Sequence, residues 1–115
     1  MFVYGTLKRG GSNHACLAGQ AFVGDARTAP GFRLYELDGY PGMVPEAGDR
    51  DGVFGEVWEV DAVCLSHLDA LEGVGEGLYL RTRVPLLPPF ADQPVETYLY
   101  ARSVVGRRNL GSIWT

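Results

Sequence analysis

The sequence has few residues of the kinds that cross-link small proteins or bind metals. Its 115 residues include two cysteines and two histidines. Neither Cys16 nor Cys64 lies in a Cys-x-x-Cys motif, and His14 and His67 are far apart. This spacing indicates no zinc site, and we expect no bound metal. Two free thiols are typical of a reducing compartment.

Basic clusters and long apolar runs are also missing. The net charge is −4, and no basic run is longer than Arg107-Arg108. We expect no nucleic-acid partner, because phosphate binding requires a positive surface. No apolar run reaches the roughly 20 residues of a membrane-spanning helix. The first residues, 1–4, begin a strand-like pattern without the basic and apolar start of a signal peptide. We therefore expect a cytoplasmic protein that does not contact membranes.

Glycine, in contrast, is abundant. The chain has 16 glycines, which favours tight turns and a β-rich fold. Hydrophobic residues make up 46% and charged residues 21%, close to globular averages. We expect a single domain over residues 1–115 with a core of its own.

Most of the chain is predicted to form short strands. The strongest segment, 53–60, alternates so that Glu56 shares a face with Trp58. Glu56 is either an inward acid or an edge charge, and the edge is favoured. Gly55 indicates a bulge or a close approach of other atoms to the backbone. The other predicted strands or extended segments are 2–4, 21–24, 32–37, 40–44, 78–84 and 95–101.

One α-helix is predicted between a cap and a stop. Asp61 is a suitable N-cap, apolar residues recur with helical period over 63–71, and Gly73 is a suitable C-terminal stop. Residues 13–19 are predicted as a second, short helix. These elements favour an α+β fold, a mixed or antiparallel sheet that curls toward a small barrel with a helix packed on it.

Glu72 is the first candidate for chemistry. It lies at the last turn of the predicted helix, where the helix dipole disfavours a negative charge. In a partly apolar cleft, desolvation would raise its pKa further, as a general base near neutral pH requires. From position alone, a solvated glutamate at a helix end is the favoured interpretation.

The second candidate is the loop Tyr4-Gly5-Thr6-Leu7. A strand that ends in Gly-Thr can turn its amides toward one point and form a small anion-binding nest. An ordinary turn is the simpler interpretation. Tyr79 and Arg81 share a strand face by parity and could line a pocket, although core packing is favoured for Tyr79.

Several stretches together resemble the γ-glutamylcyclotransferase-like superfamily, with its AIG2-like, γ-glutamylamine cyclotransferase and BtrG branches. They follow the family's order and cover about residues 2 to 101. The most specific combination is the Tyr-Gly-Thr-Leu loop with a Leu-Asp-x-x-Glu-Gly segment and a following Tyr-x-Arg. The matching stretches are 3–10, 13–14, Leu17, 22–26, 40–42, 53–60, 68–73 and 78–81.

The resemblance implies a small mixed β-barrel with flanking helices. It also implies an enzyme that cyclises a γ-glutamyl-amine or γ-glutamyl-amino acid to 5-oxoproline and a free amine, without a cofactor. Glu72 would be the catalytic base. The substrate would be bound by Tyr4, Gly5, Thr6 and Leu7. Tyr79 and Arg81, in the matching Tyr-x-Arg segment, would also bind it. We expect a small-molecule γ-glutamyl substrate as the partner, and a monomer or homodimer.

Three alternatives remain open at the level of sequence. The same fold could be a non-catalytic module that binds a small ligand, with Glu72 in recognition. The same pocket could carry out a different acyl transfer or a hydrolysis. A purely structural protein is the third alternative.

Overall fold

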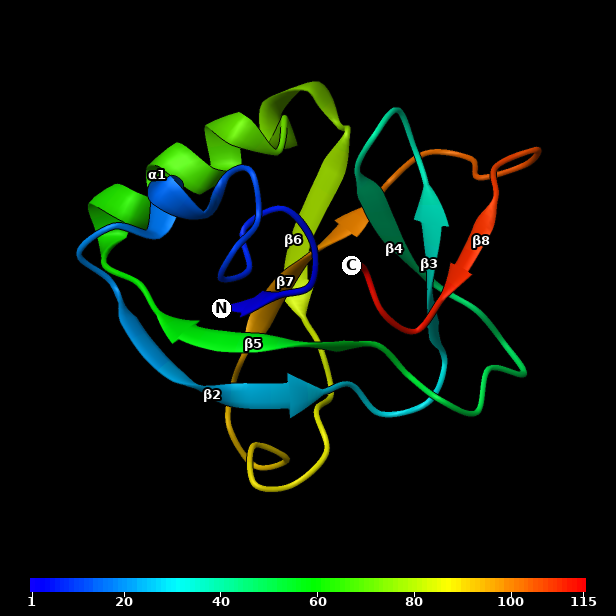
Figure 1. Ribbon diagram of the computed structural model, residues 1–115, viewed down its shortest axis with the longest axis horizontal. Helices are drawn as coiled ribbons and strands as arrows, with labels where there is room; N and C mark the ends of the chain where they lie inside the picture. The colour runs from blue at the N-terminus through cyan, green and yellow to red at the C-terminus, as the bar shows by residue number, and fades with distance from the viewer.

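The computed structural model describes all residues, 1–115, as an α+β fold with one α-helix, α1, and eight strands (Figure 1). The α+β class expected from the sequence is confirmed. The strands are β1 (Phe2–Val3), β2 (Ala21–Arg27), β3 (Phe32–Glu36), β4 (Pro41–Pro45), β5 (Phe54–Glu59), β6 (Tyr79–Arg83), β7 (Glu96–Tyr100) and β8 (Asn109–Gly111). The helices are α1 (Ala62–Leu71) and two short 3-10 helices, η1 (His14–Leu17) and η2 (Val74–Glu76).

The strands form three small sheets, in the orders β1-β5-β2, β4-β3-β8 and β6-β7. Every ladder is antiparallel, so the mixture of strand directions implied by the resemblance is not found within the sheets. The sheets nevertheless curl around one another. Strand β7 packs beside both β1 and β4. The Phe54 amide donates to the Ser112 carbonyl at 2.8 Å and so joins the start of β5 to the segment after β8. The result is an open barrel rather than a continuous ring of ladders.

Helix α1 lies across one side of the sheets, with η1 beside it (Figure 1). Its N-terminus forms locally, because Asp61 Oδ1 accepts a hydrogen bond from the Cys64 amide at 2.8 Å. Its C-terminus ends at Glu72, followed by Gly73 in the left-handed region with φ of +63°. Leu68 packs its fully buried side chain into one of the two hydrophobic clusters of the core. This local arrangement places Glu72 where the helix meets β6.

The close approach indicated by Gly55 is confirmed within the protein itself. A Cβ atom at this position would lie 2.4 Å from the Val3 carbonyl oxygen and 2.6 Å from a ring carbon of Phe2. A side chain at residue 55 would therefore push β1 away from β5. Since the candidate substrate loop begins where β1 ends, this glycine also decides where that loop starts.

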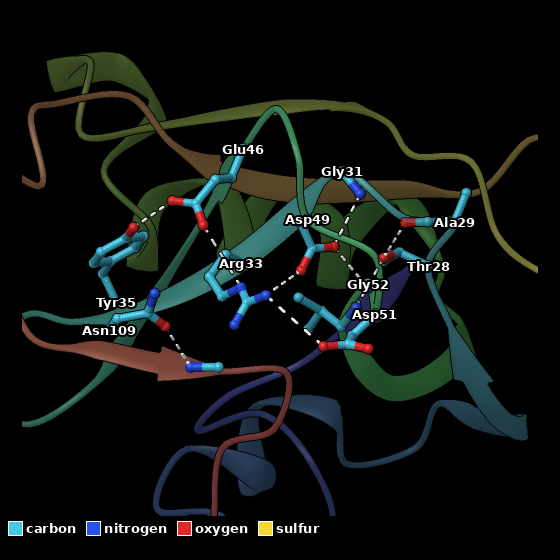
Figure 2. Close-up of polar contacts among 12 residues, drawn as sticks. Thr28, Ala29, Gly31, Arg33, Tyr35, Glu46, Asp49, Asp51, Gly52 and Asn109 are labelled. Carbon is cyan, nitrogen blue, oxygen red and sulfur yellow. Dashed lines mark hydrogen bonds and ion pairs between the residues drawn. The ribbon is translucent and has the colours of Figure 1, made fainter.

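The loop between β4 and β5 is held by an arginine surrounded by carboxylates (Figure 2). Arg33 Nη2 lies 2.6 Å from Asp49 Oδ1, and the other oxygen of Asp49 accepts the amides of Gly31 and Gly52. Burial alone would raise the pKa of Asp49, but these hydrogen bonds outweigh burial and lower the pKa to about 2. Asp49 therefore stays ionised and ties the loop to β3.

Two elements differ in kind from the sequence predictions. Residues 13–19 form only the short 3-10 helix η1, and Asn13 makes no side-chain hydrogen bond that would cap it. Strand β8 lies in the tail, for which no strand was predicted. It forms by pairing with β3, and a three-residue strand has too little alternation to be recognised alone.

Candidate active site

A cleft opens where β1, α1 and β6 meet. Among the predicted site residues, it brings together the loop Tyr4 to Leu7, Glu72 and Tyr79. The loop and the glutamate are 65 or more residues apart in the chain, so only folding makes them neighbours. The full lining is Phe2, Val3, Tyr4, Gly5, Thr6, Leu7, Tyr40, Pro41, Glu72, Tyr79 and Tyr98.

The loop presents three consecutive amides that have no partner in the protein. No backbone or side-chain oxygen accepts a hydrogen bond from the N–H of Gly5, Thr6 or Leu7. Gly5 and Leu7 are buried, and buried amides in folded proteins are nearly always paired. Three consecutive donors that no protein group accepts are therefore available at this cleft to bind an anionic group.

The carbonyls of the two peptide units that carry the Thr6 and Leu7 N–H groups accept hydrogen bonds on the other side of the loop. Gly5 O accepts the Lys8 amide at 3.1 Å, and Thr6 O accepts the Asn13 amide at 2.9 Å. In a trans peptide the C=O and N–H groups point in opposite directions. Holding the carbonyls in this way turns the N–H groups of Thr6 and Leu7 away from residues 8–13. The loop is thus pre-organised to donate to an anionic oxygen.

Glu72 is the one carboxyl residue among the residues that line the cleft. It is half-buried at the end of α1, where its amide donates to the Leu68 carbonyl at 2.9 Å. Burial raises the pKa of its carboxyl from 4.5 to about 7. No donor in the protein hydrogen-bonds to the carboxylate to offset that burial. A carboxyl with this pKa exists in both protonation states near neutral pH, as a general base requires.

Four tyrosines line the cleft, and the hydroxyls of three of them are hydrogen-bonded to other parts of the protein. Tyr4 donates to the Tyr98 carbonyl at 2.6 Å, and Tyr79 donates to the Pro41 carbonyl at 3.0 Å. Tyr98 donates to Asp69 Oδ1 at 2.7 Å. Burial raises the pKa of all three phenols far above the usual value, so they stay protonated. The rings shape the cleft, and the hydroxyls brace it.

Arg81 does not line the cleft. Its Nε lies 3.5 Å from Asp69 Oδ1, the oxygen that accepts the Tyr98 hydroxyl. It is also the register partner of Tyr98 on β7. The structure therefore separates Tyr79 from Arg81, although strand parity places them on one face. Arg81 supports a wall residue from behind, and its contact with a substrate stays a prediction.

Glu56 is not an edge charge, as was favoured from the sequence, but a buried carboxylate in the middle strand of its sheet. The reason is a partner from far along the chain. Glu56 accepts the Arg9 amide at 3.1 Å and Arg9 Nε at 2.9 Å. It also accepts Trp58 Nε1 at 3.1 Å. Burial would raise its pKa, but the bonds from Trp58 and Arg9 lower it below the usual value.

Five lining residues were not chosen as site residues from the sequence, among them Tyr40, Pro41 and Tyr98. Tyr40 and Pro41 lie in a stretch that matches the resembled family, so a signal for them existed. No signal in the sequence pointed to Tyr98, because a tyrosine on the inward face of a strand is normally interpreted as a core residue. No group of three or more His, Cys, Asp or Glu side chains is gathered in a way that could hold a metal ion. None of the helices is long and apolar enough to cross a membrane.

The α+β fold thus brings free amides and a carboxyl with a raised pKa together in one cleft. A family model described as gamma-glutamyl cyclotransferase, AIG2-like, matches residues 1–114. The chain belongs to this family.

Individual relatives agree with this assignment. The Escherichia coli K12 gamma-glutamylcyclotransferase family protein YtfP is 34% identical, over 97% of this chain and 91% of its own. A Bos taurus gamma-glutamylaminecyclotransferase is 36% identical over 87% of this chain. The crystal structure of an AIG2-like protein from Mus musculus superposes with a TM-score of 0.68 at 32% identity, covering 90% of this chain and 76% of that one. The chain spans 62%, 50% and 63% of the curated relatives from Vibrio cholerae, Drosophila melanogaster and Bos taurus.

Proposed function

We propose that the protein is an enzyme that cyclises a γ-glutamyl-amine or γ-glutamyl-amino acid to 5-oxoproline and releases the amine. The observation that carries the proposal is the meeting of two complementary groups in one cleft. The free amides of Gly5, Thr6 and Leu7 suit an anionic oxygen, and Glu72 has a pKa of about 7. Membership of the family supports the same reaction.

The reaction is an intramolecular acyl transfer. The α-amine of the γ-glutamyl group attacks its own γ-carbonyl, so a lactam C–N bond forms. The C–N bond to the leaving amine then breaks. Because the nucleophile is already tethered, proximity supplies much of the rate. The protein must therefore supply proton transfer and stabilisation of the oxyanion.

Glu72 takes a proton from the attacking nitrogen and delivers a proton to the leaving nitrogen. Its pKa suits both steps, because a carboxyl near neutrality accepts and returns protons with similar ease. The loop amides stabilise the negative oxygen of the tetrahedral intermediate or bind the carboxylate of the substrate. The rings of Tyr4, Tyr79 and Tyr98 enclose the aliphatic part of the glutamyl group and reduce its contact with water.

The test is a product assay on a panel of γ-glutamyl-amines and γ-glutamyl-amino acids, with products identified by mass. We expect 5-oxoproline from at least one member. Linear glutamate would indicate hydrolysis instead. Binding without turnover across the panel would indicate a binding module, and either result would overturn the proposal.

A further inference from the structure

Glu56 is a buried charge that the proposed reaction does not use directly. It lies in the middle strand β5, where its Cα partners are Val3 on β1 and Asp25 on β2. Its side chain is only 9% exposed. A buried carboxylate is costly unless it is fully hydrogen-bonded, and here three N–H donors converge on its two oxygens.

Two of those donors come from one residue next to the free amides. Arg9 follows Leu7 by two positions, and both its backbone N–H and its guanidinium Nε bind the Glu56 carboxylate. The far end of the same guanidinium reaches Asp25 Oδ1 at 2.9 Å on the surface. Arg9 also stacks on the Phe22 ring, 3.9 Å from its centroid. The turn that follows the free amides is therefore attached to the sheet through both the backbone and the side chain of Arg9.

We propose that Glu56 is a positioning residue that holds the free amides of the loop in their productive orientation through Arg9. The inference rests on the proposed function. Between Leu7 and Arg9 there is one residue, Lys8, and its amide is already bound to the Gly5 carbonyl. A shift of the Arg9 backbone is thus transmitted to the peptide units that carry the free N–H groups.

Only a carboxylate satisfies this arrangement. A glutamine at position 56 has one accepting oxygen and one NH2 group. With three N–H donors aimed at the side chain, at least one of them would face another donor. The Arg9 turn would then move to relieve the conflict. A displacement of about 1 Å in groups that stabilise a transition state can cost about 100-fold in rate.

The first experiment compares Glu56→Gln with Asp25→Asn as a matched control. Asp25 has a side chain that is 80% exposed and binds the same guanidinium, so its loss removes only the surface end of the network. We expect Glu56→Gln to lower kcat about 10- to 100-fold with KM changed less than three-fold. The acid limb of the pH profile should stay in place, because Glu72 is untouched. Asp25→Asn should keep kcat within two-fold of wild type.

A second variant covers the case in which Glu56→Gln does not fold. Arg9→Ala removes a half-exposed side chain and leaves the buried strand intact. Arg9→Ala should also lower kcat. The variant that carries both Arg9→Ala and Glu56→Gln should lower kcat no more than the more damaging of the two single substitutions does. If the variant that folds keeps kcat within two-fold of Asp25→Asn, the inference is wrong. A variant in which the acid limb of the pH profile moves as kcat falls would also overturn the inference, because the substitution would then act by changing the pKa of Glu72.

Amide NMR separates this inference from the proposed function. We expect the signals of Gly5, Thr6 and Leu7 to shift, and their exchange with solvent to quicken, in Glu56→Gln or Arg9→Ala but not in Asp25→Asn. If wild type released no 5-oxoproline, the proposed function would fail, and these signals alone would decide the positioning role. Unchanged signals would overturn it, whatever the activity.

Discussion

Replacing Glu72 with glutamine should stabilise the protein while removing its chemistry. The side chain is half-buried without a hydrogen-bond donor, and burial raises its pKa from 4.5 to about 7. In the unfolded chain the carboxyl ionises near 4.5. Between these values the folded protein binds a proton that the unfolded chain has lost, so the free energy of unfolding falls as pH rises through this window.

The size of the effect follows from the shift. Each pKa unit corresponds to about 1.4 kcal/mol, so ionising Glu72 in the folded state costs up to about 3 kcal/mol above pH 7. Glutamine has a similar shape and no charge, so Glu72→Gln should recover most of this above pH 8 and almost none at pH 4. The loss of a general base should lower kcat about 100- to 10,000-fold.

Two measurements on the same samples test this. Denaturant unfolding at pH 4, 6 and 8 gives the stability difference, and 5-oxoproline release from pH 5 to 9 gives the activity. Wild type should show an acid limb near pH 7 rather than 4.5. Glu76→Gln, an exposed glutamate four residues further on, is the matched control and should change neither quantity.

The reasoning would be refuted by either of two results. An acid limb near pH 4.5 would mean that burial does not raise the pKa of Glu72. A glutamine variant that turns over substrate at the wild-type rate would mean that Glu72 is not the base.

Three further predictions concern the loop, the β4–β5 connection and the helix. Gly5→Ala would bring a Cβ within 2.7 Å of Pro41 Cγ, so the loop should shift and 5-oxoproline release should fall at least about 10-fold, measured at saturating substrate. Asp49→Asn should lower the free energy of unfolding by about 3 kcal/mol at pH 7, because it breaks a buried pair with an arginine. The pKa of Asp49 is about 2 against an ordinary 3.8, so its contribution to stability is complete above pH 4 and is lost as pH falls toward 2. The difference in the free energy of unfolding between variant and wild type, measured with denaturant, should therefore disappear at that acidic pH. Asp61→Ala should cost about 1 kcal/mol in denaturant unfolding, because it removes the cap on the Cys64 amide, and a change below 0.3 kcal/mol would count against the cap.

Elements with local causes were predicted well. Asp61 caps the helix by accepting a hydrogen bond from the Cys64 amide, three residues further along the chain. Gly73 ends the same helix through its own backbone freedom. Strand β5 lies within the predicted segment 53–60 because alternation is also a local property. Strand β8 was missed because it exists only through pairing with β3.

Placements that depend on distant partners were not predicted. Glu56 looked like an edge charge because its principal partner, Arg9, is 47 residues away. Strand parity placed Tyr79 and Arg81 on one face, because parity describes a strand alone. Asp69 on helix α1 lies beside Arg81 and draws it away from the cleft. In both cases the deciding charge comes from another element.

The sequence by itself determined the family, the α+β class and the chemical identity of the candidate groups, because these depend on residue type and short-range order. The tertiary structure decided what those groups can do. A glutamate at a helix end is ordinary until burial moves its pKa to about 7. A Gly-Thr turn is ordinary until its carbonyls are bound and its amides left free. Both depend on which atoms surround a group and exclude water, and only the folded chain determines that.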